Sequence, residues 1–112
     1  MCPLPYQYCE SLTQYKRLAT REVNIGGIPV GGDNPIRLQS MTNTNTADTA
    51  ATVEQIKRIA DAGADYVRMT TRNVNEAHNL EMIREKLVRQ NYAVPLVADV
   101  HFNPRVAEIA AV

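Results

Sequence analysis

Apolar residues are concentrated in three short runs that begin at residues 36, 66 and 96. After the first two runs, apolar side chains recur every three or four residues. Continuous apolar runs are typical of buried parallel strands, whereas a three- to four-residue spacing is typical of helices that bury one side. The pattern therefore predicts strands that alternate with helices, with strands over 36–41, 66–70 and 96–100 and helices over 48–62 and 76–90.

Capping residues indicate where the predicted helices begin and end. Gly63 ends the first helix, because glycine readily adopts the left-handed conformation that closes many helices. Asn73, with Glu76 three residues later, is typical of the capping box that starts a helix. Asn103 as a cap and Pro104 at the first helical position predict a third helix directly after the third strand.

A strand–helix unit thus recurs every 30 residues, which implies right-handed parallel crossovers. Two architectures fit this pattern, a doubly wound sheet and a (β/α)₈ TIM-type barrel. A complete barrel takes about 250 residues, so we expect these 112 residues to be a fragment of a larger α/β chain. The isolated piece would leave sheet edges and helix faces bare, and we expect it to be marginally stable or to self-associate.

The first part of the chain is less regular. Residues 1–21 have mixed polarity, and we interpret them as a leader with a short helical turn around 10–18. In 22–32, two short extended pieces flank Gly26-Gly27, which is a signal for a two-residue hairpin turn. We therefore divide the chain into a leader, 1–21, and the first strand–helix units of an α/β domain, 22–112, that a β-hairpin precedes.

Composition narrows the classes of partner. The formal net charge is zero, which gives no indication of a nucleic-acid or anionic-membrane partner. No stretch approaches the roughly 20 apolar residues of a membrane span, and the first residues lack the features of a signal peptide. A cytoplasmic location is therefore expected. Cys2 and Cys9 do not have metal-motif spacing, and we interpret them as ordinary reduced thiols.

Charged side chains occur where the second and third predicted strands end. Asp99 and His101 are two residues apart, so they point to the same side of a strand. Parallel α/β sheets bind their ligands at the carboxyl ends of the strands. The alternative is that Asp99 caps a turn and His101 is a rim residue. Arg68 interrupts an apolar strand, and it could pair with Asp99 or bind a ligand phosphate.

The loop after the first strand offers uncharged hydrogen-bonding groups. Ser40, Thr42 and Asn43 could contact a ligand, or they could belong to a turn rich in capping residues. We favour the second interpretation for Thr46 and Asp48. Together with an arginine, an acid and a histidine, such groups suit a small anionic polyol, with phosphate as the most plausible anion. Many barrel enzymes would share these features.

Three segments together resemble one enzyme family, the 4-hydroxy-3-methylbut-2-enyl diphosphate synthases. They are Ile-Arg-Leu-Gln-Ser-Met-Thr-Asn-Thr at 36–44, Gly-Ala-Asp-Tyr-Val-Arg at 63–68 and Pro-Leu-Val-Ala-Asp-Val-His-Phe at 95–102. The similarity runs from residue 21 to residue 112 and includes the Gly-Gly-Ile-Pro-Val-Gly hairpin. Because the motifs share one order and spacing, the resemblance is specific.

The resemblance implies the N-terminal portion of a TIM-type barrel, followed in the family by a domain that carries a [4Fe-4S] cluster on three cysteines and a glutamate. It implies an iron–sulfur oxidoreductase of isoprenoid (terpenoid) biosynthesis in the methylerythritol phosphate pathway. The reaction would be the reductive ring opening and dehydration of 2-C-methyl-D-erythritol 2,4-cyclodiphosphate, with ferredoxin or flavodoxin as the electron donor. A head-to-tail homodimer is also implied.

The family's substrate-binding residues can be carried over where the motifs match. Arg68 matches the strand-end arginine that binds the diphosphate, and Asp99 and His101 match an Asp-x-His at the pocket wall. Thr42 and Asn43 match a Met-Thr-Asn-Thr loop at the same rim. The cluster ligands and the catalytic glutamate would lie beyond these 112 residues, so we expect no catalytic or metal-binding residue in this segment and no activity from it alone.

Two other interpretations compete with this one. A pterin-binding barrel of the dihydropteroate synthase kind would also place polar residues at its strand ends, and it would lack downstream iron–sulfur cysteines. A non-catalytic barrel fragment would self-associate and bind anions weakly.

Overall fold

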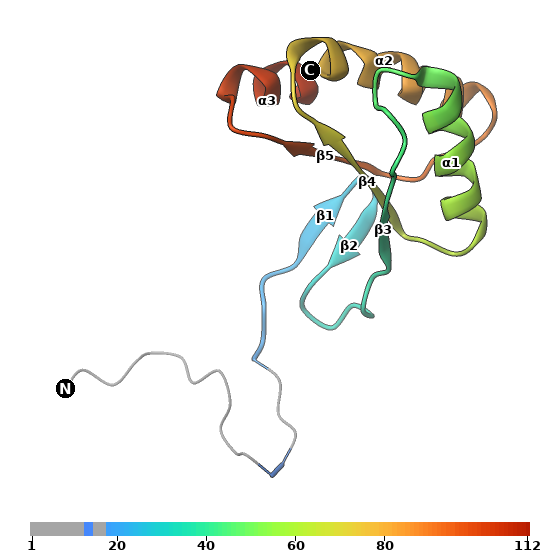
Figure 1. The fold of residues 1–112 in the computed structure, drawn as a ribbon. Helices are drawn as coiled ribbons and strands as arrows, with labels where there is room; N and C mark the ends of the chain where they lie inside the picture. The colour runs from blue at the N-terminus through green and yellow to red at the C-terminus, as the bar shows by residue number, and fades with distance from the viewer. Residues whose placement is uncertain (1–12, 15–17) are drawn as a thin grey trace.

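The computed structural model describes residues 13–14 and 18–112. An antiparallel hairpin of β1 (Val23–Ile25) and β2 (Ile28–Val30) comes first. Three strand–helix units follow, made of β3 (Gln39–Met41), α1 (Thr49–Asp61), β4 (Tyr66–Thr71), α2 (Val74–Arg89), β5 (Leu96–Val100) and α3 (Pro104–Ala111). The predicted hairpin, strands and helices are therefore confirmed (Figure 1). Cys2, Cys9 and most of the turn expected over 10–18 lie outside the described residues.

The strands β3, β4 and β5 form one parallel sheet in that order. Helix α2 contacts both α1 and α3, and the three helices lie together on one side of the sheet (Figure 1). A doubly wound sheet carries helices on both faces, so this arrangement favours the barrel. Three strands do not close a barrel, and the closed form stays a prediction.

The core lies between the sheet and the first two helices. Alternate side chains of β4, Val67 and Met69, are fully buried on the helix-facing side of the strand. They pack against apolar side chains that recur every three or four residues on α1 and α2, namely Val53, Ile56, Ile83 and Leu87. The other face of β4 carries Arg68 and Thr70, so alternation along one strand separates the core from the charged face.

The observed boundaries differ from the predicted ones by more than one residue at two elements. Strand β3 covers only the second half of the predicted 36–41. Its first residues make other bonds, because Arg37 Nε donates to the Pro29 carbonyl and the Leu38 N–H donates to the Asp65 carboxylate. Helix α2 begins at Val74, directly after its cap Asn73, rather than at 76. No helix in the described part of the chain is long and apolar enough to cross a membrane.

The hairpin packs against the amino ends of β4 and β5. The Tyr66 hydroxyl donates to the Ile28 carbonyl over 2.7 Å. Gly26 has a φ of +59°, and a Cβ built there would lie 2.8 Å from the Pro95 side chain. The turn therefore uses glycine both for its left-handed conformation and for its close approach to Pro95. Because the hairpin covers the amino ends, the carboxyl ends of the strands form the opposite edge of the sheet.

Candidate functional site

Arg68, Asp99 and His101 lie together near the carboxyl edge of the sheet. Arg68 Nη2 donates to Asp99 Oδ2 over 2.8 Å, and His101 Nε2 lies 3.4 Å from the same oxygen. The β4–β5 register explains the pairing, because Thr70 is opposite Asp99 and Arg68 points to the same face two residues earlier. The structure therefore confirms the proposed pairing of Arg68 with Asp99.

This cluster is partly open to solvent. The side chains of Arg68, Asp99 and His101 are 41%, 24% and 38% exposed. The hydrogen bond from Arg68 lowers the pKa of the Asp99 carboxyl below its ordinary value of 3.8, against the opposing effect of burial, and His101 lowers it further. A charged carboxylate thus fixes the guanidinium and faces the imidazole.

One buried nitrogen of the Arg68 guanidinium, Nε, makes no hydrogen bond to the described residues. Buried polar atoms nearly always have a partner, so an unpaired donor needs an explanation. An anionic oxygen that bound here could accept a hydrogen bond from Arg68 while Asp99 kept its own bond.

A second charged pair follows β4 in the chain. Arg72 Nη2 donates to Glu76 Oε1 over 2.7 Å, and the Arg72 backbone N–H donates to Glu76 Oε2 over 2.7 Å. Asn73 caps α2 by accepting from the Glu76 N–H, as the capping box predicts, but the Glu76 carboxylate binds Arg72 rather than Asn73. The prediction overlooked this pair, although its four-residue spacing could have indicated it.

The loop residues Thr42 and Asn43 are not both at this cluster. The amide groups of Asn43 and Gln55 bond to each other, with Gln55 Nε2 donating to Asn43 Oδ1 over 2.6 Å. The Thr42 N–H donates to the Arg68 carbonyl, and the Thr42 hydroxyl is buried without a partner among the described residues. Asn43 is thus attached to α1, whereas Thr42 lies beside β4.

The remaining polar residues of this loop attach it to the helices. Asp48 caps α1 by accepting from the Ala51 N–H, which confirms its predicted capping role. Thr46 is not a cap, because its hydroxyl donates to the Thr70 carbonyl over 2.6 Å. Asn79 of α2 in turn donates to the Thr46 carbonyl. Several polar groups of this loop therefore hold it against β4 and the helices.

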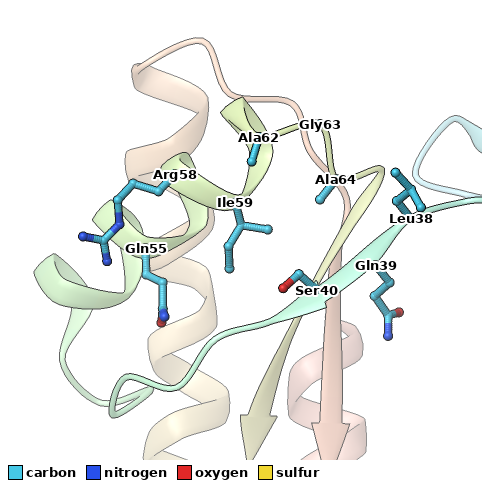
Figure 2. A pocket seen from close by; sticks show the side chains of 9 residues that line it. All are labelled: Leu38, Gln39, Ser40, Gln55, Arg58, Ile59, Ala62, Gly63 and Ala64. Carbon is cyan, nitrogen blue, oxygen red and sulfur yellow. The ribbon is translucent and has the colours of Figure 1, made fainter.

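A hollow of about 400 Å³ lies between β3 and α1, at the unpaired edge of the sheet. Figure 2 shows Leu38 and Ser40 on the strand side and Gln55, Arg58 and Ile59 on the helix side. Arg68, Asp99, His101, Thr42 and Asn43 do not line it, whereas Ser40 does. It is a feature of the open sheet edge and separate from the Arg68 cluster.

A parallel sheet with its helices on one side is the arrangement of strand–helix barrel domains, and in this chain charged residues lie near the carboxyl edge of the sheet. A family model described as the GcpE TIM-barrel domain matches residues 20–112. The chain belongs to this family.

Curated relatives agree with this family. A protein of Bacteroides thetaiotaomicron named 4-hydroxy-3-methylbut-2-en-1-yl diphosphate synthase (flavodoxin) is 64% identical over 100 residues, which is 89% of this chain and 16% of that protein. A rice (Oryza sativa) protein is named 4-hydroxy-3-methylbut-2-en-1-yl diphosphate synthase (ferredoxin), chloroplastic. It is 50% identical over 101 residues, which is 90% of this chain and 14% of that protein. The resemblance to these synthases is thereby confirmed, and the chain spans about one sixth of their length.

Proposed function

We propose that this chain supplies the first part of the substrate-binding barrel of a 4-hydroxy-3-methylbut-2-enyl diphosphate synthase in isoprenoid biosynthesis. Its role would be to bind 2-C-methyl-D-erythritol 2,4-cyclodiphosphate for reductive ring opening and dehydration. The observation that carries this proposal is the cluster of Arg68, Asp99 and His101 on one face of two neighbouring strands. The names of the relatives support it.

Each residue of the cluster has a separate part in binding. Arg68 would neutralise a phosphoryl group, with Nε as the donor that has no partner among the described residues. Asp99 holds the guanidinium in place. His101, whose Nε2 lies 3.4 Å from Asp99 Oδ2, would contact an oxygen of the substrate. Thr42 and Asn43 stay proposed rim contacts, and Asn43 would have to share its amide with Gln55 to act as one.

Electrons would come from outside this segment. The relatives are named for flavodoxin and ferredoxin, which supports one of these as the electron donor. No group of three His, Cys, Asp or Glu side chains in the described part of the chain could hold a metal ion, so these residues do not fit a cluster site. We therefore place the ligands of the proposed [4Fe-4S] cluster elsewhere in a longer polypeptide, which would act as a homodimer.

The test is an Arg68→Gln substitution in the full-length protein. Hydrogen bonds to charged groups contribute about 1.5–3 kcal/mol, so we expect the dissociation constant for the cyclodiphosphate to rise at least about tenfold. Calorimetric titration measures it directly. Arg89→Gln is the matched control, because Arg89 pairs with Glu85 on the exposed side of α2. Equal affinity in the Arg68→Gln and wild-type proteins would overturn the proposed role.

A further inference from the structure

A buried carboxylate holds the guanidinium of Arg72 in a fixed position. Glu76 is only 2% exposed, and its two oxygens accept from the Arg72 backbone N–H and from Nη2, each over 2.7 Å. Arg72 Nε donates to the same carboxylate over 3.2 Å. Three donors of one residue thus bind one carboxylate. The side chain loses its freedom before any ligand arrives, which reduces the entropic cost of binding.

The other side of this guanidinium faces outward. The Arg72 side chain is 58% exposed, and no hydrogen bond from Nη1 occurs among the described residues. Exposed ion pairs usually contribute little to stability. Here the buried Glu76 anchors Arg72, and the guanidinium keeps further N–H donors for a ligand. The fork geometry of these donors suits phosphoryl oxygens.

Arg72 lies beside the Arg68 cluster. It directly follows Thr71, the last residue of β4, and the Thr71 carbonyl accepts from the His101 N–H over 3.2 Å. Arg68 and Arg72 are four residues apart, which places their Cα atoms about 13 Å apart along an extended strand. Each guanidinium is held by its own carboxylate, Asp99 for Arg68 and Glu76 for Arg72.

We propose that Arg72 is a second anion-binding residue of this rim and makes the site selective for a diphosphate over a monophosphate. Glu76 is its positioning residue. This inference rests on the proposed function, because it assigns the second phosphoryl group of the same substrate. A single phosphate would need only Arg68, whereas two linked phosphoryl groups could engage both arginines.

The experiment compares two probes, inorganic pyrophosphate and orthophosphate, in calorimetric titrations of the full-length protein. Arg72→Gln should weaken pyrophosphate binding about tenfold, the loss of one charge-assisted contact, and leave orthophosphate binding within about twofold. Arg72→Lys keeps the charge that the buried Glu76 requires but loses the fork, so we expect an intermediate loss. Arg89→Gln, from the exposed pair with Glu85, should change neither affinity.

The outcomes separate the two proposals. If Arg68→Gln weakens pyrophosphate binding and neither Arg72 variant does, Arg72 has no role and the proposed function survives. If neither arginine affects pyrophosphate binding, both proposals are wrong. An equal loss for the two probes would show that Arg72 serves only as the counter-ion of Glu76. Should Arg72→Gln fail to fold, the pyrophosphate-to-orthophosphate ratio of Arg72→Lys decides, and an unchanged ratio overturns the inference.

Discussion

Asp99 and Glu76 are carboxylates whose charge the folded structure stabilises. A hydrogen bond from Arg68 lowers the pKa of Asp99, and hydrogen bonds from Arg72 lower the pKa of Glu76, while burial opposes both shifts. A carboxyl group whose pKa is lower in the folded than in the unfolded chain stabilises the fold above its unfolded pKa. That contribution is lost as the pH falls through the folded pKa. Both pairs therefore stabilise the fold at neutral pH, and this stabilisation is lost in acid.

We predict that Asp99→Asn flattens this acid dependence. The asparagine cannot be charged, so the free energy of unfolding should fall less steeply between about pH 5 and pH 3 than in the wild-type protein. Urea titrations at a series of pH values measure the slope. Arg68→Gln should flatten it as well, and the double variant should add little, because the two side chains form one interaction. A wild-type slope in Asp99→Asn would show that this ion pair does not contribute.

For single residues, the sequence predicts which side chains of one strand point to the same side. It does not predict which residues of different segments contact each other. The two-residue interval between Asp99 and His101 places both on one side, which the structure bears out. The partner of Asn43 is Gln55, twelve residues away, and no local pattern indicates it. The sequence left open whether Arg68 pairs with Asp99 or binds a ligand phosphate, and the strand register explains why it pairs with Asp99.

A partly buried hydrogen bond joins the hairpin to β4. Tyr66 is 4% exposed and donates to the Ile28 carbonyl. Tyr66→Phe should lower the free energy of unfolding by about 1 kcal/mol, because the carbonyl loses its donor. Tyr92→Phe is the matched control, since the Tyr92 hydroxyl bonds to Asp61 at an exposed position and should contribute less. Denaturant titration compares the two, and an equal or smaller effect at Tyr66 would contradict this view of the hairpin.

Helices α1 and α2 end in the same way with different residues. Gly63 follows the last turn of α1 with a φ of +103°, and Asn91 follows α2 with a φ of +64°. Gly63→Ala should cost about 1 kcal/mol, because a Cβ disfavours this backbone conformation even where space is free. Asn91→Gly should instead stabilise the protein by a few tenths of a kcal/mol. Thermal unfolding of the two variants should therefore shift in opposite directions, and a shared direction would refute the argument.

The order of the elements follows from periodicity, and their ends depend on neighbours. Apolar spacing predicts both long helices and all three parallel strands. It also predicts a strand from residue 36, but the side chain of Arg37 bonds to the hairpin and the N–H of Leu38 bonds to Asp65. These bonds come from segments that the local pattern does not include, so β3 begins only at Gln39.

At the scale of the whole molecule, the described sheet has two open edges. Strands β3 and β5 each pair on one side only. Leu38, which lines the hollow between β3 and α1, is exposed. A 30-residue repeat predicts the crossovers between neighbouring strands. It carries no information about which distant strand pairs with β3 or β5, so the closed barrel depends on the family match rather than on the repeat.

We expect the purified 112-residue chain to bind pyrophosphate weakly and not to convert the cyclodiphosphate. It covers 16% of a relative's length, and no group of three potential metal ligands occurs in its described residues. With the cyclodiphosphate and a chemical reductant, product formation should stay at the level of the reductant alone. The same chain should retain weak pyrophosphate binding that Arg68→Gln removes, which separates a folded but incomplete site from an unfolded one. Reductant-dependent turnover by this chain would refute the division of binding and redox chemistry between different parts of the protein.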